Sequence, residues 1–227
     1  MITFVIPTIN EEINIRKTLK FFIKLKKKII FNVIIVDDKS SDNTVGVAKS
    51  FKKKLNLKVI SNQMPQGLGY ALLIGFKKSK KGSVIFLDAD LSITKRDIVK
   101  MIKICSKNEN EIVIGSRYLP RSKIVGSSRF KVFLSKYLNK IISFCFQVPV
   151  CDMSHSFRSI KRNIKIQTHN HTHPGFFWEM TINAYKNGIL IKEIPIKFYD
   201  RKYGLTKNSS LRMIKSIFTS IKNLIHR

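Results

Sequence analysis

The acidic residues of this chain gather in a few short clusters although they are scarce overall. Asp and Glu together number only 14, yet the chain contains Asn10-Glu11, Asp37-Asp38 and Asp88-Ala89-Asp90, each after an apolar run. Four carboxylates placed directly after two buried strands are poorly explained by surface solvation. Mg²⁺ and Mn²⁺ prefer such oxygen ligands and commonly share them with the phosphates of a nucleotide. The clusters therefore indicate a site for a divalent cation and a diphosphate. Asp88-Ala89-Asp90 alone is also compatible with a turn that caps a helix.

Two further polar patterns are less specific. Gly67-Leu68-Gly69 begins a helical pattern, where glycine either lets the backbone approach a ligand or makes a tight turn. It is not the three-glycine dinucleotide fingerprint, which would directly follow the first strand. His169, His171 and His173 alternate, and imidazole is a common metal ligand. Because no Cys or carboxylate lies close to them in sequence, we interpret this run as a polar loop.

The elements that must position the acidic clusters follow from the hydrophobic pattern. Short apolar runs rich in β-branched residues predict strands at residues 2–6, 33–36, 57–60, 84–87 and 112–114. Helical spacing separates the early strands, with helices expected at 10–28 and 43–54 and a further one that Thr94 caps together with Asp97. Strands that alternate with helices form a mostly parallel sheet with helices on both faces. Ligands bind such sheets beyond the carboxyl ends of the strands, where the acidic clusters lie.

Composition and charge restrict the class of protein. The 227 residues, 44% of them hydrophobic, suffice for one globular domain, and 43 Lys and Arg against 14 acids give a net charge of +29. This charge favours anionic partners such as nucleic acid, anionic lipid or phosphorylated ligands, although many of the lysines are equally compatible with a solvated surface. Three unpaired cysteines argue against a disulfide framework and a zinc site. No leader pattern and no apolar run of about 20 residues are present, so neither secretion nor a membrane span is expected.

Two segments read as basic amphipathic helices. Residues 130–146 mix Phe, Leu, Ile and Tyr with Lys, and residues 209–227 repeat that style at the end of the chain. Helices of this kind lie in a lipid interface, but a core-facing helix with a solvated lysine face has the same pattern. We expect a domain at residues 1–206 and a basic amphipathic C-terminal helix at 207–227.

Taken together, the motifs resemble family-2 glycosyltransferases, most closely the branch of dolichol-phosphate mannose synthases and polyprenyl-phosphate glycosyltransferases. The resemblance is carried by ordered segments over nearly the whole chain: 5–11, 36–44, 67–69, 88–92, 114–118, 175–179, 193–198 and 200–204. It implies a GT-A fold, which is an α/β, Rossmann-like domain that binds a nucleotide sugar, and an inverting transfer that depends on Mn²⁺ or Mg²⁺. A phosphate acceptor is already a nucleophilic anion, whereas a hydroxyl acceptor would need a general base.

The resemblance also implies site residues. Those expected to bind the donor are Pro7, Thr8, Asn10, Glu11, Asp37, Asp38, Gly67, Asp88, Ala89, Asp90, Arg201 and Lys202. Those expected to hold the metal are Asp88, Asp90 and Ser92, and the groups expected to act in catalysis are Asp90, Arg117 and Arg201. Those expected to receive the acceptor phosphate are Arg117, Arg129, Lys131, Ser135 and Lys136. Arg117 is also compatible with a structural salt bridge, and Glu179 with either an acceptor-side role or a partner for a buried Arg.

The chain departs from the family pattern at two places. His155 and Ser156 replace a small pair in the segment 152–158, which narrows the space near the sugar or the acceptor. Lys39 stands where the family commonly has Gly, beside the expected nucleotide pocket. The membrane helices that follow the domain in some relatives have no counterpart here.

The leading hypothesis is transfer of a hexose, mannose or glucose, from GDP or UDP to a polyprenyl phosphate. The enzyme would lie on the cytosolic face of a membrane, held by an anionic surface or by a small membrane-anchoring subunit. A second hypothesis is transfer to a hydroxyl of a glycan, lipid or protein. A third is a non-catalytic protein that binds membrane or nucleic acid. Nucleic acid is disfavoured, because the acidic strand ends would repel a polyanion in the absence of metal.

Overall fold

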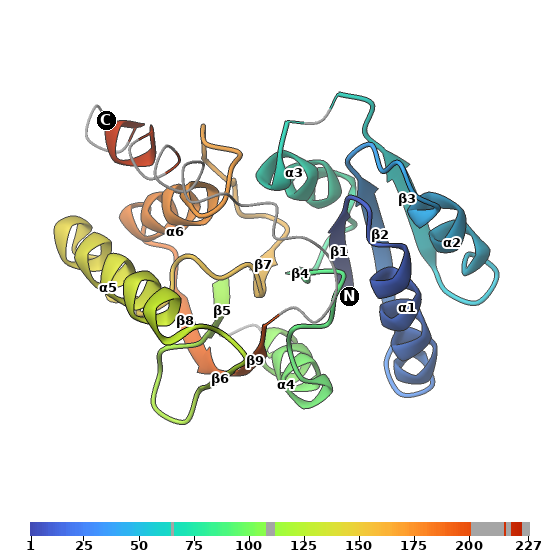
Figure 1. Ribbon diagram of the computed structural model, residues 1–227, viewed down its shortest axis with the longest axis horizontal. Helices are drawn as coiled ribbons and strands as arrows, with labels where there is room; N and C mark the ends of the chain where they lie inside the picture. The colour runs from blue at the N-terminus through green and yellow to red at the C-terminus, as the bar shows by residue number, and fades with distance from the viewer. Residues whose placement is uncertain (65, 108–111, 201–215, 217–218, 224–227) are drawn as a thin grey trace.

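The structure is a computed structural model that describes residues 1–64, 66–107, 112–200, 216 and 219–223. Within this part of the chain, seven strands form the main sheet in the order β3-β2-β1-β4-β7-β5-β8 (Figure 1). They are β1 (Ile2–Thr8), β2 (Phe31–Asp37), β3 (Leu57–Ser61), β4 (Ser83–Phe86), β5 (Ile112–Ser116), β7 (Arg158–Lys161) and β8 (Ile191–Pro195). A second sheet pairs β6 (Lys123–Val125) with β9 (Lys197–Tyr199).

The expected mostly parallel sheet is confirmed, with one exception. β1 pairs in parallel with β2 and β4, β2 with β3, and β5 with β8. β7 lies between β4 and β5 and runs antiparallel to both. Because β1, β2 and β4 are parallel neighbours, their carboxyl ends lie at the same edge of the sheet.

Helices cover both faces of the sheet, as the hydrophobic pattern predicts (Figure 1). Apolar side chains of α1 (Glu12–Lys26), α2 (Thr44–Ser50) and α4 (Lys95–Cys105) form one core cluster, with Phe4, Ile6 and Ile35 of the strands. Those of α3 (Leu68–Lys78), α5 (Arg129–Phe146) and α6 (Gly175–Lys186) form the other, with Val5 and Ile34. Successive strand residues therefore enter opposite cores, as the two-residue period of a strand requires.

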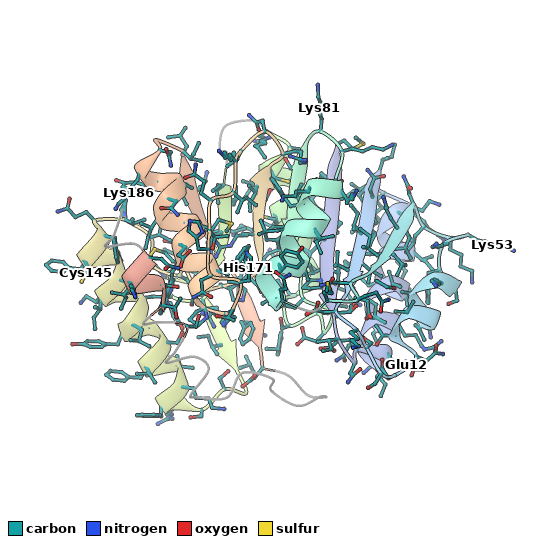
Figure 2. The ribbon with its side chains drawn as sticks, turned by 90° about the horizontal axis from the view of Figure 1, so that it is seen from above. Glu12, Lys53, Lys81, Cys145, His171 and Lys186 are labelled. Atoms are coloured by element: carbon teal, nitrogen blue, oxygen red, sulfur yellow. The ribbon has the colours of Figure 1, made fainter. Side chains whose placement is uncertain are left out.

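The ends of the helices follow their sequence signals. Thr94 caps α4 by accepting a hydrogen bond on its hydroxyl from Asp97 N at 3.1 Å, as predicted. Ser128 caps α5 in the same way. Figure 2 shows Lys53 and Lys81 pointing away from the body of the protein, so these charges lie in solvent.

The expected C-terminal helix, 207–227, falls mostly outside the described residues. Residues 216 and 219–223 are helical. Their polar side chains bind α6 and the loop before it. Asn170 Nδ2 of the loop donates to Ser220 Oγ at 2.8 Å, and Asn223 Nδ2 donates to Glu179 Oε1 of α6 at 2.9 Å. No helix within the described residues has both the length and the apolar character that a membrane crossing requires.

Candidate active site

The ends of β1 and β2 are joined by a network of hydrogen bonds to buried carboxylates. Thr8 Oγ1 donates to Asp37 Oδ1 at 3.0 Å, and Asp38 N donates to Thr8 O at 2.8 Å. Asn62, after β3, donates its Nδ2 to Asp38 Oδ1 at 2.7 Å. Asp37 and Asp38 are 2% and 9% exposed. Neutral hydrogen-bond donors therefore hold both carboxylates at the edge of the sheet. This is the edge at which the sequence predicted the acidic clusters to lie.

The loops that follow β1 and β2 are bonded to each other. Asn10 N donates to Ser40 Oγ at 2.9 Å, and Asn10 Oδ1 accepts from Ser41 N at 2.7 Å. Glu11 N donates to Thr44 Oγ1 at 2.8 Å. The structure thus brings together one group of the expected donor-binding residues, namely Pro7, Thr8, Asn10, Glu11, Asp37 and Asp38.

The acidic loop after β4 lies at the same edge. Asp90 Oδ1 accepts a hydrogen bond from Ser92 N at 3.0 Å, which closes a tight turn, and Asp88 Oδ2 accepts one from Ser156 Oγ at 2.7 Å. The carbonyl of Ala89 accepts from Thr18 Oγ1 of α1 at 2.6 Å. These contacts fix the loop between the helix that follows β1 and the turn that precedes β7.

This loop has the chemistry of a divalent-cation site that is completed by its ligand. Within the described residues, no group of three or more His, Cys, Asp or Glu side chains is placed to enclose a metal. Asp88 and Asp90 supply carboxylate oxygens from one short turn. Mg²⁺ is typically bound by one or two carboxylates together with substrate phosphates and water, so this donor set fits such an ion.

Arg117, after β5, forms a buried ion pair with Asp152. Its Nε lies 2.8 Å from Asp152 Oδ2 and its Nη2 lies 2.9 Å from Asp152 Oδ1. Nη2 also donates to Ser154 Oγ at 3.0 Å. Burial alone would raise the pKa of Asp152, but the charge and hydrogen bonds of Arg117 lower it to about 2. Arg117 is therefore in a salt bridge, and its partner Asp152 was not among the residues predicted from the sequence.

The turn that contains His155 and Ser156, one of the two departures from the family pattern, lies directly beside these groups. Ser154 N donates to Asn139 Oδ1 at 3.1 Å, which ties the turn to α5. His155 is 4% exposed and its ring lies edge-on to Phe198, with 5.6 Å between the centroids. Burial, followed by repulsion from Arg117, lowers the pKa of His155 to about 3, so its ring is neutral.

The expected acceptor-binding residues of α5 divide into two groups. Ser135 faces inward and its Oγ accepts from Tyr118 OH at 2.6 Å, which places it beside the residue after Arg117. Arg129, Lys131 and Lys136 are exposed on the helix. The described contacts join Ser135 to the Arg117 region, but they do not join Arg129 or Lys131 to it.

Gly67, directly before α3, and Gly69, in its first turn, allow a loop to pack closely against the start of this helix. Gly67 has a positive φ of 98°, and Gly69 N donates to His171 O at 2.8 Å. A Cβ at Gly69 would lie 2.4 Å from the ring of Phe176. The close approach of residues 171 and 176 to the start of α3 accounts for both glycines. Gly67 was expected to contact the donor, and its described contacts are with this loop instead. His171 lies near the middle of the molecule in Figure 2.

Glu179 organises the same loop. Its Oε2 accepts from His169 N at 2.8 Å and from Asn170 N at 3.1 Å. The buried Arg158 donates instead to the carbonyls of Met153 and His155. The interpretation of Glu179 as the partner of a buried Arg is therefore not what the described contacts show.

Arg201 and Lys202 lie outside the described residues. The last residue before them, Asp200, accepts a hydrogen bond on Oδ2 from Ser127 Oγ at 3.0 Å, and its N donates to Val125 O at 2.8 Å. Tyr199 N donates to Ser92 O at 2.8 Å. The chain therefore leaves the described part next to the acidic loop and the start of α5.

Comparison with known proteins gives consistent matches. The model of the family described as glycosyl transferase family 2 matches residues 3–167. A dolichol-phosphate mannosyltransferase of Pyrococcus furiosus is 30% identical over 135 residues, 60% of this chain and 38% of that protein. A polyprenol monophosphomannose synthase of Mycolicibacterium smegmatis is 26% identical over 196 residues, 82% of this chain and 74% of that protein. The chain thus spans well under half the length of the Pyrococcus relative.

Solved structures show the same fold. The mannosyl-3-phosphoglycerate synthase of Rubrobacter xylanophilus superposes with a TM-score of 0.77 at 15% identity, over 100% of this chain and 74% of that one. The glucosyl-3-phosphoglycerate synthase of Mycobacterium tuberculosis, in complex with UDP, gives 0.71 at 16% identity, over 98% of this chain and 79% of that one. These likenesses establish the GT-A arrangement of the sheet and helices that the sequence predicts.

Proposed function

The chain belongs to glycosyl transferase family 2, and on that premise we propose that this glycosyltransferase transfers a hexose from a nucleotide sugar to a polyprenyl phosphate. The hexose is mannose or glucose, the nucleotide is GDP or UDP, and the transfer proceeds with inversion. The names of the Pyrococcus and mycobacterial relatives, which refer to dolichol phosphate and polyprenol, support this acceptor class. The proposal assigns the reaction to the cytosolic face of a membrane, with the protein bound peripherally.

The donor side of the proposal rests on the acidic edge of the sheet. Asn10, Glu11, Asp37 and Asp38, together with Pro7 and Thr8, lie where the base and ribose of a nucleotide would bind. Asp88 and Asp90, with Ser92, would hold a Mn²⁺ or Mg²⁺ ion. A glucosyl-3-phosphoglycerate synthase related in fold contains Mn²⁺ and UDP together, which supports this assignment. When bound, the cation would stabilise the negative charge of the diphosphate leaving group.

The observation that carries the choice of acceptor is the weak basicity of the groups beside Arg117. Against the opposing effect of burial, Arg117 lowers the pKa of Asp152 to about 2. Burial and nearby cations lower the pKa of His155 to about 3 and that of His173 to about 4. A general base works best with a pKa near the working pH, so these three are poor bases for a hydroxyl acceptor. A phosphate acceptor needs no such base, because it is already a nucleophilic anion. We therefore favour a phosphate over a hydroxyl.

The surface of α5 supports a membrane location for that acceptor. Its exposed large apolar side chains are Phe130, Phe133, Leu134, Tyr137, Ile141 and Phe144. At 100° per residue these six lie opposite the buried Asn139 and Ile142. The exposed cations Arg129, Lys131, Lys136 and Lys140 flank the apolar stripe on both sides. This is the arrangement of a helix that lies in the interface of an anionic bilayer.

The same helix lies at the side of the molecule. Figure 1 shows α5 at the opposite end from α2, and Figure 2 places Cys145 on this outer side. The inward residues Ser135 and Asn139 meanwhile connect α5 to Tyr118 and Ser154. A membrane bound to the outer face of α5 would thus lie beside the Arg117 region, which suits a lipid-linked acceptor.

The test is a transfer assay with product analysis. Radiolabelled UDP- and GDP-sugars would be incubated with Mn²⁺ or Mg²⁺ and a short-chain polyprenyl phosphate. The proposal predicts a lipid product whose sugar is released by mild acid, because a sugar phosphate is labile there. A product that resists both mild acid and alkali would identify a hydroxyl acceptor and reject the proposal. Failure to bind any nucleotide sugar would favour the non-catalytic alternative.

A further inference from the structure

His155 carries two buried nitrogens that the described structure leaves without a hydrogen-bond partner. Among the described residues, four buried side-chain nitrogen or oxygen atoms lack a partner, and two of them are Nδ1 and Nε2 of His155. Buried polar groups are nearly always paired, since an unsatisfied one loses its hydration without compensation. An imidazole unpaired at both nitrogens is therefore an exception that calls for a ligand.

The other buried polar groups of the same region are paired. His173 Nε2 lies 3.0 Å from Ser154 O, and Arg158 donates to Thr181 Oγ1 at 2.9 Å as well as to two carbonyls. Asn139 bonds both Ser154 and Trp178. The buried polar side chains around His155 thus have protein hydrogen-bond partners, whereas both ring nitrogens of His155 have none among the described residues.

The position of His155 is next to both halves of the candidate site. The following residue, Ser156, donates to Asp88, one of the proposed metal carboxylates, at 2.7 Å. The ring of Phe198 contacts both His155 and Arg117: it lies edge-on to the imidazole, and its centroid lies 5.6 Å from the guanidinium carbon. His155 is therefore close to the Arg117–Asp152 pair and adjacent in sequence to the residue that bonds the acidic loop, near the place where the sugar of a donor held by that loop would be transferred.

We propose that His155 is a specificity-determining residue that hydrogen-bonds a hydroxyl group of the transferred sugar. A neutral imidazole presents one N–H donor and one nitrogen acceptor, and a hydroxyl group can satisfy either of them. A fully ionised phosphate can only accept, so it could satisfy the N–H of the ring but not its unprotonated nitrogen. Burial beside Arg117 and Arg158 keeps the ring neutral, which agrees with the lowered pKa of His155. The inference rests on the proposed function, because it requires a nucleotide-sugar donor.

The test separates recognition of the sugar from structural support. Dissociation constants would be measured by calorimetry for UDP-glucose, GDP-mannose, UDP and GDP, each with Mn²⁺, for the wild type and for His155→Leu. We expect His155→Leu to weaken the sugar nucleotide roughly ten-fold while the nucleoside diphosphate is unchanged. The melting temperature of the unliganded protein should stay the same or rise, because two unpaired polar atoms are removed.

Amide variants identify the nitrogen that acts. The amide of Asn mimics Nδ1 and that of Gln mimics Nε2, so His155→Asn or His155→Gln should restore part of the lost affinity for the sugar nucleotide. His173→Leu is the matched control: it loses the bond to Ser154 O, so its melting temperature should fall without a change in the ratio of the two dissociation constants.

The outcomes are distinct. If His155→Leu lowers the melting temperature and leaves that ratio unchanged, His155 is a structural residue and the inference is wrong. A loss of affinity for the nucleoside diphosphate as well would assign the residue to general packing of the site, and would also overturn the inference. If the wild type binds no nucleotide sugar, the proposed function itself fails, and the inference with it.

Discussion

Ser156 Oγ donates a hydrogen bond of 2.7 Å to Asp88 Oδ2, across 68 positions of the sequence. This contact joins the acidic loop after β4 to the turn before β7, which also holds Asp152 and His155. The proposed donor side and the proposed acceptor side are therefore coupled through one serine. Ser156, like its neighbour His155, is a position at which the chain departs from the family pattern.

Removal of the Ser156 hydroxyl should lower the apparent affinity of the enzyme for the divalent cation. A group that orients a metal-binding carboxylate typically accounts for 10- to 100-fold in metal affinity or activity. We expect Ser156→Ala to raise the Mn²⁺ concentration for half-maximal transfer roughly ten-fold. The control is Ser79→Ala, which deletes a 2.6 Å bond to Phe76 O at the end of α3. An unchanged Mn²⁺ requirement in Ser156→Ala would show that the bond does not position Asp88.

The Arg117–Asp152 pair should make the free energy of unfolding depend on pH in the acidic range. The pKa of Asp152 lies at about 2 in the folded protein, below its ordinary 3.8, so the folded state favours the charged carboxylate. The stabilisation is complete above pH 4 and is lost as the pH falls from about 4 to 2, and it is worth about 2 kcal/mol.

Asp152→Asn provides the measurement. The variant leaves Arg117 buried without its counter-charge, which costs about 3–5 kcal/mol at neutral pH. Denaturant unfolding across pH 2 to 7 should show that it loses less further stability below pH 4 than the wild type does. Parallel pH curves for the two proteins would contradict the assignment of this pair.

Lys39 is predicted to make the folded protein less stable than glycine would at the same position. Its φ is 63°, in the left-handed region, which disfavours side chains with a Cβ by roughly 1 kcal/mol. Lys39→Gly should therefore raise the free energy of unfolding by about 0.5–1 kcal/mol. Lys49→Gly, on the exposed side of α2, should lower it by about 1 kcal/mol, since glycine weakens a helix. Destabilisation by Lys39→Gly would mean that the lysine side chain makes a stabilising contact in the folded protein.

The apolar stripe of α5 should bind anionic membranes. Phe133 and Phe144 are 65% and 84% exposed, so replacing both with Ser should leave the melting temperature unchanged. Binding to liposomes that contain anionic lipid should fall roughly 10- to 100-fold, as expected for the loss of two inserted aromatic side chains.

The control for the stripe is Ile30→Ser, at an isoleucine that is 91% exposed and lies outside α5. It should bind liposomes as the wild type does in a flotation assay. If none of the proteins binds at any lipid composition, the membrane proposal for α5 is wrong and a protein anchor becomes the alternative.

Much of the fold is predictable because its signals are local. Strands β1 to β5 coincide with short β-branched runs, and the acids that follow β1, β2 and β4 meet because parallel neighbours end at one edge. Strand β7 was missed because Arg158-Ser-Ile-Lys has no apolar run, and its buried Arg158 is satisfied by carbonyls brought from elsewhere. β8 is a short strand with charges inside it, which resembles a loop in sequence.

The site was predictable only in part for a related reason. The residue types at the strand ends carry the chemistry, so the sequence shows them directly. Their partners come from distant segments: Asp152 pairs with Arg117 across 35 positions, and Asn62 with Asp38 across 24. Such pairings depend on tertiary packing. The lack of hydrogen-bond partners for the two ring nitrogens of His155 can likewise be recognised only in the folded structure.

The most direct test is metal-dependent sugar transfer to a polyprenyl phosphate by the wild type, Asp90→Asn and Glu12→Gln. Glu12 is the matched control, because its side chain is partly exposed and, among the described residues, forms a 3.7 Å ion pair with Arg16. The account predicts that the wild type and Glu12→Gln form an acid-labile lipid product only with Mn²⁺ or Mg²⁺. Asp90→Asn should lose at least about 100-fold of that activity while it remains folded. Equal transfer by Asp90→Asn and the wild type, or transfer that persists without metal, would contradict the account.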